Sequence, residues 1–238
     1  MKKLALGFVL LVAARAFAVD VTACGQVVAT RTTGVLTADL DCSSAAGAFA
    51  VDLADRATLQ LAGHTISGRG VICRERCTVS GPGDITGAEP GLTLLGSRRV
   101  TVNGGISIHG NRDGIYGGAR LTLIDVDVSN NMDSGVFTLG RQVKGSNVVI
   151  NDNGAFGLFA QDAAVRLVGL IANDNGWFGV NAKRVRLLDS TLTGNEGGHP
   201  ANPPFVDVVS SRRPRLVNTT CDHSLGPDGI VWGVCAQD

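Results

Sequence analysis

Short runs in which apolar residues alternate with polar ones follow one another along most of the chain. Residues 121–128, 165–168 and 185–188 show this pattern, with an apolar residue at about every second position. A period of two directs successive side chains to opposite faces of an extended strand, and polar turn residues separate the runs. The pattern therefore predicts an all-β protein built from strands of about four to six residues.

The runs belong to a longer repeat, in which a glycine followed by an apolar residue returns about every 22 residues. The intervals are 21, 23, 21, 22 and 22 residues, between Gly70, Gly91, Gly114, Gly135, Gly157 and Gly179. Such a period is typical of a solenoid, in which each repeat buries its apolar side only by stacking on its neighbours. Three short strands per repeat predict a right-handed parallel β-helix of about seven to eight coils.

Asparagines form a second register, at intervals of 20 or 22 residues, at Asn111, Asn131, Asn153, Asn175 and Asn195. We interpret this row as a stack of side chains that hydrogen-bond to one another and to the turn backbone. The alternative interpretation is a polar strip that contacts sugars.

The N-terminus has the features of a cleaved secretory leader. Lys2 and Lys3 precede an apolar run over residues 4–14, and residues 16–18 form an A-x-A cleavage site. We expect residues 1–18 to be removed and residues 19–238 to form a single β-helix domain with capping ends. The leader carries three of the 21 basic residues, so its loss makes the formally neutral chain acidic. No later apolar run approaches the roughly 20 residues of a membrane-spanning helix, and we expect a secreted or periplasmic protein.

The 6 cysteines are even in number, which in an exported chain indicates disulfides rather than metal thiolates. Proximity in the sequence favours the pairs Cys24 with Cys42, Cys73 with Cys77, and Cys221 with Cys235. Two of these pairs would close the ends of the stack, where a solenoid exposes strand edges and an open core. The alternative for the central pair is a metal site, but no histidine-rich segment lies near it, so we predict no metal.

The segment of residues 59–68, Leu-Gln-Leu-Ala-Gly-His-Thr-Ile-Ser-Gly, occurs together with Asn-x-x-x-Gly-apolar repeats. In these features the chain, from about residue 24 to 220, resembles the right-handed β-helix repeat proteins of the pectate lyase-like superfamily. That superfamily includes polysaccharide lyases, glycoside hydrolases, uronate epimerases and exported proteins without an assigned reaction. The resemblance therefore implies the fold, and it leaves both enzymatic and binding functions open.

Motifs that the resemblance would imply for particular reactions are missing. The chain has none of the Asn-Thr-Asp, Asp-Asp, Gly-His-Gly and Arg-Ile-Lys segments of galacturonan hydrolases, nor the Asp-Pro-His of alginate epimerases. We therefore favour a noncatalytic protein that binds carbohydrate or a cell-envelope polyanion. The competing interpretation is a polysaccharide lyase, or another enzyme that acts on acidic polysaccharide.

Under the enzyme interpretation, the candidate catalytic carboxylates are Asp125 and Asp127, which the strand period directs outward on one strand. Such a pair could hold calcium or act as an acid and a base, and Lys144 or Arg166 would be the base of a lyase. The alternative is that both carboxylates are solvated strand residues. No cofactor is expected outside the lyase interpretation, in which calcium would be the metal.

Basic residues recur a few positions after nearly every repeat glycine, so stacking should gather them along one side of the rod. The candidate ligand-binding residues are Arg120, Arg141, Lys144, Arg166, Lys183, Arg184 and Arg186. Such a ridge fits an acidic polysaccharide or the phosphates of an envelope glycolipid. The alternative is that these side chains only break up exposed strand edges. Nucleic acid is disfavoured because the chain is predicted to be exported and has few aromatic residues for base stacking.

Overall fold

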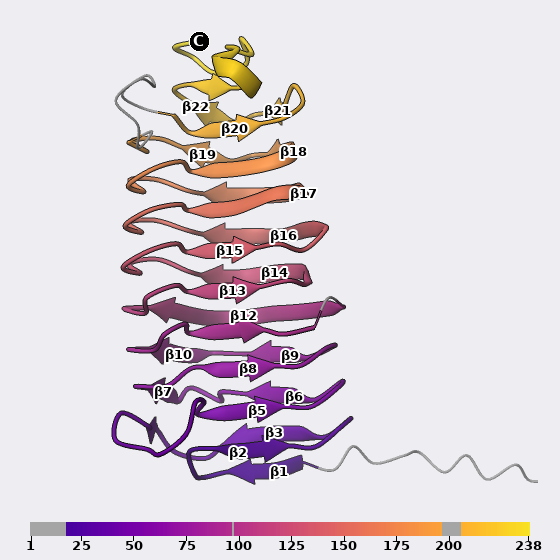
Figure 1. The fold of residues 1–238 in the computed structure, drawn as a ribbon, viewed down its shortest axis with the longest axis vertical. Coiled ribbons are helices and arrows are strands. Elements are labelled where there is room, and N and C mark those ends of the chain that lie inside the picture. The colour runs from indigo at the N-terminus through magenta and orange to yellow at the C-terminus, as the bar shows by residue number, and fades with distance from the viewer. Residues whose placement is uncertain (1–17, 97, 197–205) are drawn as a thin grey trace, which may run out of the picture.

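The structure is a computed structural model that describes residues 18–96, 98–196 and 206–238. The chain winds into a rod of about eight stacked coils, with the first described residues at one end and the C-terminus at the other (Figure 1). The predicted right-handed parallel β-helix is thus confirmed. Of the predicted leader, only Ala18 lies within the described residues, where it begins the first strand.

Three parallel sheets run along the rod, and long strands pass from one sheet to the next at its corners. Sheet 1 consists of β2 (Gln26–Val28), β5 (Val51–Leu53), β8 (Val71–Cys73), β11 (Leu92–Leu94), β13 (Ile115–Gly117), β15 (Val136–Thr138), the starts of β17 (Leu158–Ile171) and β18 (Val180–Leu188), β20 (Val208–Ser210) and β23 (Ser224–Leu225).

Sheet 2 consists of β1 (Ala18–Val21), β3 (Thr33–Leu36), β6 (Thr58–Gln60), β9 (Thr78–Ser80), the starts of β12 (Arg99–His109), β14 (Arg120–Asp127) and β16 (Gln142–Val149), the middle of β17, the end of β18, and β21 (Arg215–Val217). Sheet 3 consists of β4 (Leu40–Asp41), β7 (Thr65–Ser67), β10 (Gly83–Thr86), the ends of β12, β14, β16 and β17, β19 (Thr191–Leu192) and β22 (Thr220–Cys221). A short 3-10 helix, η1 (Pro227–Gly229), lies near the C-terminus.

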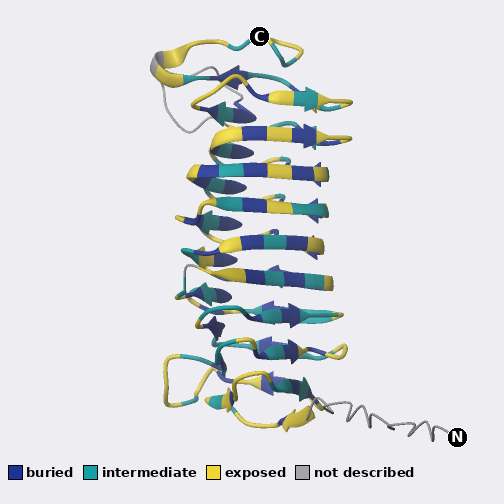
Figure 2. Cartoon of the chain, turned by 90° about the vertical axis from the view of Figure 1, so that its right-hand side faces the viewer, coloured by how far each residue is buried: buried dark blue, intermediate teal, exposed yellow. Residues whose placement is uncertain are grey.

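The core fills the inside of the rod with rows of equivalent residues. Leu121, Val143, Val165 and Val185 pair in register on four successive strands of sheet 2, and each is at most 4% exposed. Figure 2 shows buried and exposed positions alternating along these strands. The predicted period of two is therefore the alternation between the core and the solvent.

The asparagine register forms a buried ladder of amides at the corner between sheets 3 and 1. Each Nδ2 donates a hydrogen bond to the Oδ1 of the next asparagine, at 3.2, 3.0, 2.9 and 2.8 Å from Asn111 to Asn195. The same amides also donate to backbone carbonyls, for example from Asn153 to Val128 at 3.1 Å. These bonds satisfy polar groups that cannot reach water, so the ladder has the structural role that the first interpretation gave it.

The repeat glycine lies against this ladder, which explains its period. A Cβ atom at Gly135 would stand 2.8 Å from Nδ2 of Asn153, and one at Gly157 would stand 2.6 Å from the carbonyl oxygen of Gly179. A side chain at either position would push adjacent coils apart, so the stacking distance itself requires glycine.

From β14 onward, the corner between sheets 2 and 3 is a single residue with a left-handed backbone. Its φ values are 54° at Asp125, 52° at Asn147, 65° at Gly169, 49° at Asp189 and 47° at Asn218. Asp, Asn and Gly are the residues that adopt this conformation most readily. The corner therefore determines which residue types occupy this row.

All three predicted disulfides form, and the described residues contain no free cysteine. Cys24–Cys42 lies at the first coils and Cys221–Cys235 at the last, whereas Cys73–Cys77 joins the end of β8 to the turn that follows it. Three disulfides indicate an oxidising compartment. Within the described ranges, no helix is long and apolar enough to cross a membrane.

Candidate anion-binding surface

Four cationic side chains form a row on the outer face of sheet 2. Backbone pairing aligns Lys144 with Arg166, Arg166 with Arg186, and Arg186 with Arg215, and all four are exposed. We call these residues the basic row. Threonines occupy the same position in the preceding coils, at Thr33, Thr58, Thr78, Thr101 and Thr122. The position thus changes from neutral to cationic at β16.

A groove of about 780 Å³ lies where sheet 1 turns into sheet 2, and arginines dominate its lining. Its arginines are Arg76, Arg98, Arg99, Arg120 and Arg141, next to Gly118, Gly140 and the exposed Leu139. We call this hollow the arginine groove. Arg99 and Arg120 are paired on adjacent strands, so their side chains leave the sheet as neighbours.

Acidic partners neutralise the basic residues of the earlier coils. Arg74 Nε donates to Asp52 Oδ1 at 2.9 Å, and Arg76 Nε donates to Asp55 Oδ1 at 2.8 Å. The hydrogen bond from Arg76 lowers the pKa of Asp55, and the same contact raises the pKa of Arg76. These arginines therefore belong to ion pairs.

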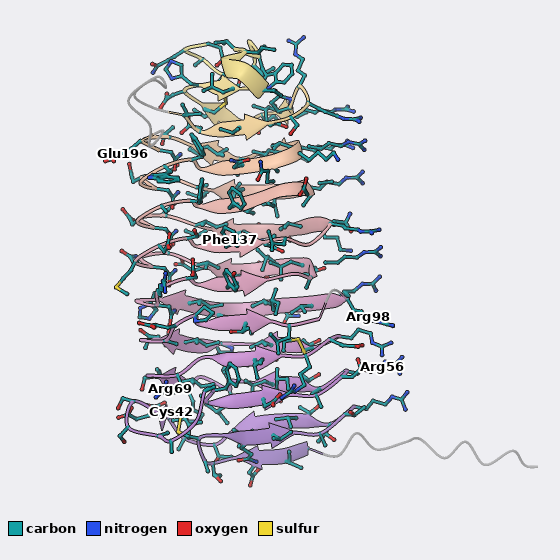
Figure 3. All side chains as sticks on the ribbon, in the orientation of Figure 1. Cys42, Arg56, Arg69, Arg98, Phe137 and Glu196 are labelled. Atoms are coloured by element: carbon teal, nitrogen blue, oxygen red, sulfur yellow. A yellow bond between two sulfur atoms is a disulfide. The ribbon has the colours of Figure 1, made fainter. Side chains whose placement is uncertain are left out.

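Arg98 is the last arginine along the chain that pairs with an acidic side chain among the described residues, and its Nε lies 3.4 Å from Oε2 of Glu75. In the part of the chain that the structure describes, no acidic side chain pairs with Arg99, Arg120 or Arg141, or with any member of the basic row. Figure 3 shows nitrogen-tipped side chains along one edge of the rod, where Arg56 and Arg98 are labelled, and Glu196 at the opposite edge. Positive charge is thus concentrated on one side although the full chain is formally neutral.

The other predicted binding residues extend this surface. Arg184 lies in the same row along the rod as Arg99 and Arg120. The intervening strands contribute Gln142 and Ala164 to this row. Lys183 precedes Arg184 in β18, and both side chains are exposed. Both therefore add positive charge to the same edge of the rod.

The two candidate carboxylates lie elsewhere. Asp125 occupies the left-handed corner between sheets 2 and 3, where its Oδ1 accepts a hydrogen bond from Nδ2 of Asn147 at 2.8 Å. Asp127 is on sheet 3 and accepts a hydrogen bond from the hydroxyl of Ser129. Both are exposed, and Val126 between them is buried, as the strand period predicts.

The structure does not bring the candidate bases into contact with Asp127. Lys144 and Arg166 project from sheet 2, whereas Asp127 projects from sheet 3 beside Val149 of the next strand. Among the residues of the described ranges, no group of three or more histidine, cysteine, aspartate or glutamate side chains is arranged to hold a metal ion. The assignment of Asp125, Asp127, Lys144 and Arg166 to catalysis remains a prediction.

Sequence reasoning missed an aromatic stack on the outer face of sheet 1. Tyr116 and Phe137 have ring centroids 5.3 Å apart, and Phe137 and Phe159 are 4.8 Å apart, with nearly parallel planes. Phe156 packs edge-on against Trp177, which is 45% exposed. The signal in the sequence was an aromatic residue two positions after three successive repeat glycines.

These rings stack on one another, so the faces of Phe137 are covered by its two neighbours (Figure 3). A sugar that stacks on an aromatic residue needs an open ring face, because the attraction comes from the face of the ring. We therefore assign Phe137 to holding adjacent coils together.

No protein-family model matches the chain, and neither a curated protein nor a solved structure matches it significantly. Its function must therefore be inferred from its own surface.

Proposed function

We propose that this protein is exported and binds an acidic polysaccharide or a related cell-envelope polyanion, without converting it. The observation that carries the proposal is that, within the described residues, Arg99, Arg120 and Arg141 of the arginine groove and all members of the basic row lack acidic partners. The same chain neutralises Arg74, Arg76 and Arg98 with acids. The remaining cations are therefore the part of the ridge that is open to an external anion.

The geometry of these cations suits a long polyanion. Neighbouring members of the basic row are one strand apart, which is about 4.8 Å along the rod. Charges at that spacing lie well within a Debye length of about 8 Å, so they repel one another, and a bound anion relieves the repulsion. Guanidinium groups also bind carboxylate, sulfate or phosphate through paired hydrogen bonds.

Export is supported by two independent features. The predicted leader of residues 1–18 would direct the chain out of the cytoplasm. The three disulfides favour an oxidising compartment, where cell-envelope polysaccharides are found. A secreted or periplasmic location is therefore part of the proposal.

The test is retention of the chain that begins at Val19 on immobilised alginate and, for comparison, on neutral dextran. We expect retention on alginate alone, and we expect added salt to weaken it, because exposed charges are screened. The double variant Arg120→Gln/Arg141→Gln should lose most of the retention. Arg112→Gln, which removes an exposed arginine outside the groove, should leave it unchanged. Equal retention of both variants would contradict the proposal.

The enzyme interpretation is tested in the same samples. Alginate and polygalacturonate are incubated with the chain, with and without calcium, and unsaturated products are followed by their ultraviolet absorbance. We expect no product. Turnover that Asp125→Asn or Asp127→Asn abolishes would replace the binding proposal with a lyase.

A further inference from the structure

An apolar row runs beside the basic row on sheet 2. Its members are Ile124, Val168, Leu188 and Val217, which are 36%, 42%, 36% and 41% exposed. Backbone pairing places them in one line along the rod, with Ser146 between the first two. Single exposed apolar side chains are common on proteins, but here they recur at one position on successive strands.

The two rows are adjacent on the same strands. Arg166 precedes Val168 by two residues in β17, and Arg186 precedes Leu188 by two residues in β18. Arg215 and Val217 repeat the arrangement in β21. Residues two apart in a strand lie on the same side, about 7 Å from each other. We call the outer side of sheet 2 from β16 to β21 the docking face.

The docking face lacks acidic side chains at its outward positions. These positions hold Gln142, Lys144, Ser146, Ala164, Arg166, Val168, Arg184, Arg186, Leu188, Arg215 and Val217. None of them lines the arginine groove, which lies over earlier coils. The docking face is therefore a strip on which a cationic row lies beside an apolar row.

We propose that the docking face binds a lipid surface that carries anionic headgroups, an inference that rests on the proposed anion binding and names a partner for the basic row. A soluble polysaccharide matches the cations but leaves the apolar row in water. A second copy of this face brings cations close to cations. An anionic lipid surface accepts both rows, because headgroup phosphates pair with Arg and Lys while apolar side chains enter the interface.

The rows run parallel to the rod axis, so the rod lies along the lipid surface and keeps sheet 1 away from it. Each basic residue near an anionic membrane contributes about 1 kcal/mol, which corresponds to about fivefold in affinity. The four cations and the apolar row together therefore give reversible attachment that salt weakens.

The test uses the chain that begins at Val19, because the leader is itself apolar and would bind lipid. Co-sedimentation is measured with phosphatidylcholine vesicles, with and without phosphatidylglycerol. We expect binding only to the anionic vesicles. Arg166→Gln/Arg186→Gln should weaken it by about 25-fold. Val168→Ser/Leu188→Ser should weaken it several-fold, with Val27→Ser as the control, because Val27 is 61% exposed on sheet 1.

Retention on alginate separates this inference from the proposed function. Val168→Ser/Leu188→Ser should bind alginate like the parent chain, since a soluble polyanion does not contact the apolar row. Equal vesicle binding by this variant and the parent, or no binding to anionic vesicles, would overturn the inference. Vesicle binding without alginate retention would overturn the proposed function and leave the lipid surface as the partner.

Discussion

Nδ2 of Asn195 donates a hydrogen bond to Oδ1 of Asp207 at 2.6 Å, so the asparagine ladder ends on a carboxyl group. Asp207 is fully buried, and its other oxygen accepts a hydrogen bond from the backbone amide of Asp222. Burial raises the pKa of Asp207 from 3.8 to about 6, although both hydrogen bonds act in the opposite direction. The last rung of the ladder is therefore a titratable group inside the C-terminal coils.

This carboxyl should make stability depend on pH. Between the unfolded pKa of 3.8 and the folded pKa of about 6, the folded protein holds the proton more tightly than the unfolded chain. Stability should therefore fall as pH rises through this window, by at most about 3 kcal/mol. Asp207→Asn should flatten the change, as measured by urea unfolding across the window.

The matched control for the pH experiment is Asp152→Asn, an exposed aspartate in an asparagine turn. It should unfold with the same pH dependence as the parent. The change that remains in Asp207→Asn combines two opposing contributions: burial raises the pKa of Asp113, whereas hydrogen bonds lower the pKa values of Asp39, Asp41, Asp55 and Asp238. If the difference in stability between the parent and Asp207→Asn did not change across the window, the role of Asp207 would be disproved.

Removal of a middle rung should be costly. Asn153→Ala takes away the acceptor of the Asn131 amide at 3.0 Å and the donors to Val128 and Asn175. Each buried group left without a partner costs about 1–3 kcal/mol, so we expect a loss of at least about 3 kcal/mol. The melting temperature should fall by about 6–12 °C. Met132→Ala, in a neighbouring turn with its side chain 70% exposed, should change it little.

Two glycines of the arginine groove allow a matched test of how closely adjacent coils stack. A Cβ at Gly140 would lie 1.7 Å from the carbonyl oxygen of Ala119, whereas a Cβ at Gly118 would meet nothing within 4 Å. We expect Gly140→Ala to destabilise the fold by about 2–3 kcal/mol because backbone must move, and Gly118→Ala to be neutral. Thermal unfolding of the two variants measures the difference, and similar melting temperatures would show that the coils are not closely stacked there.

The disulfides should differ in their effects on stability. Cys24–Cys42 spans 18 residues and Cys73–Cys77 spans 4, so the first constrains the unfolded chain more. The loop-entropy relation gives about 3 kcal/mol for the longer loop and about 2 kcal/mol for the shorter one. Urea unfolding of the two double Cys→Ser variants should show this order. The reverse order would mean that native contacts, rather than loop closure, determine the contribution.

The arrangement around Asp125 and Asp127 shows how far strand alternation predicts position. The alternation directs Asp125 and Asp127 outward, and both side chains are exposed. It did not reveal that Asp125 has a left-handed backbone at a corner. A period of two describes a straight strand, and the bend between two sheets interrupts it.

The sequence alone predicted the solenoid and the asparagine ladder, because stacking places residues one repeat apart in contact. It also favoured the disulfide pairs, because the two cysteines of each pair are close in the chain. Only the tertiary structure decided which cations are neutralised. Arg76 reaches Asp55 and Arg98 reaches Glu75, whereas Arg120 has no acidic partner among the described residues. The partners of these ion pairs are about one repeat apart, so the period places them on adjacent coils. Pairing also depends on the direction in which each side chain leaves the corner of its coil, which the period does not give.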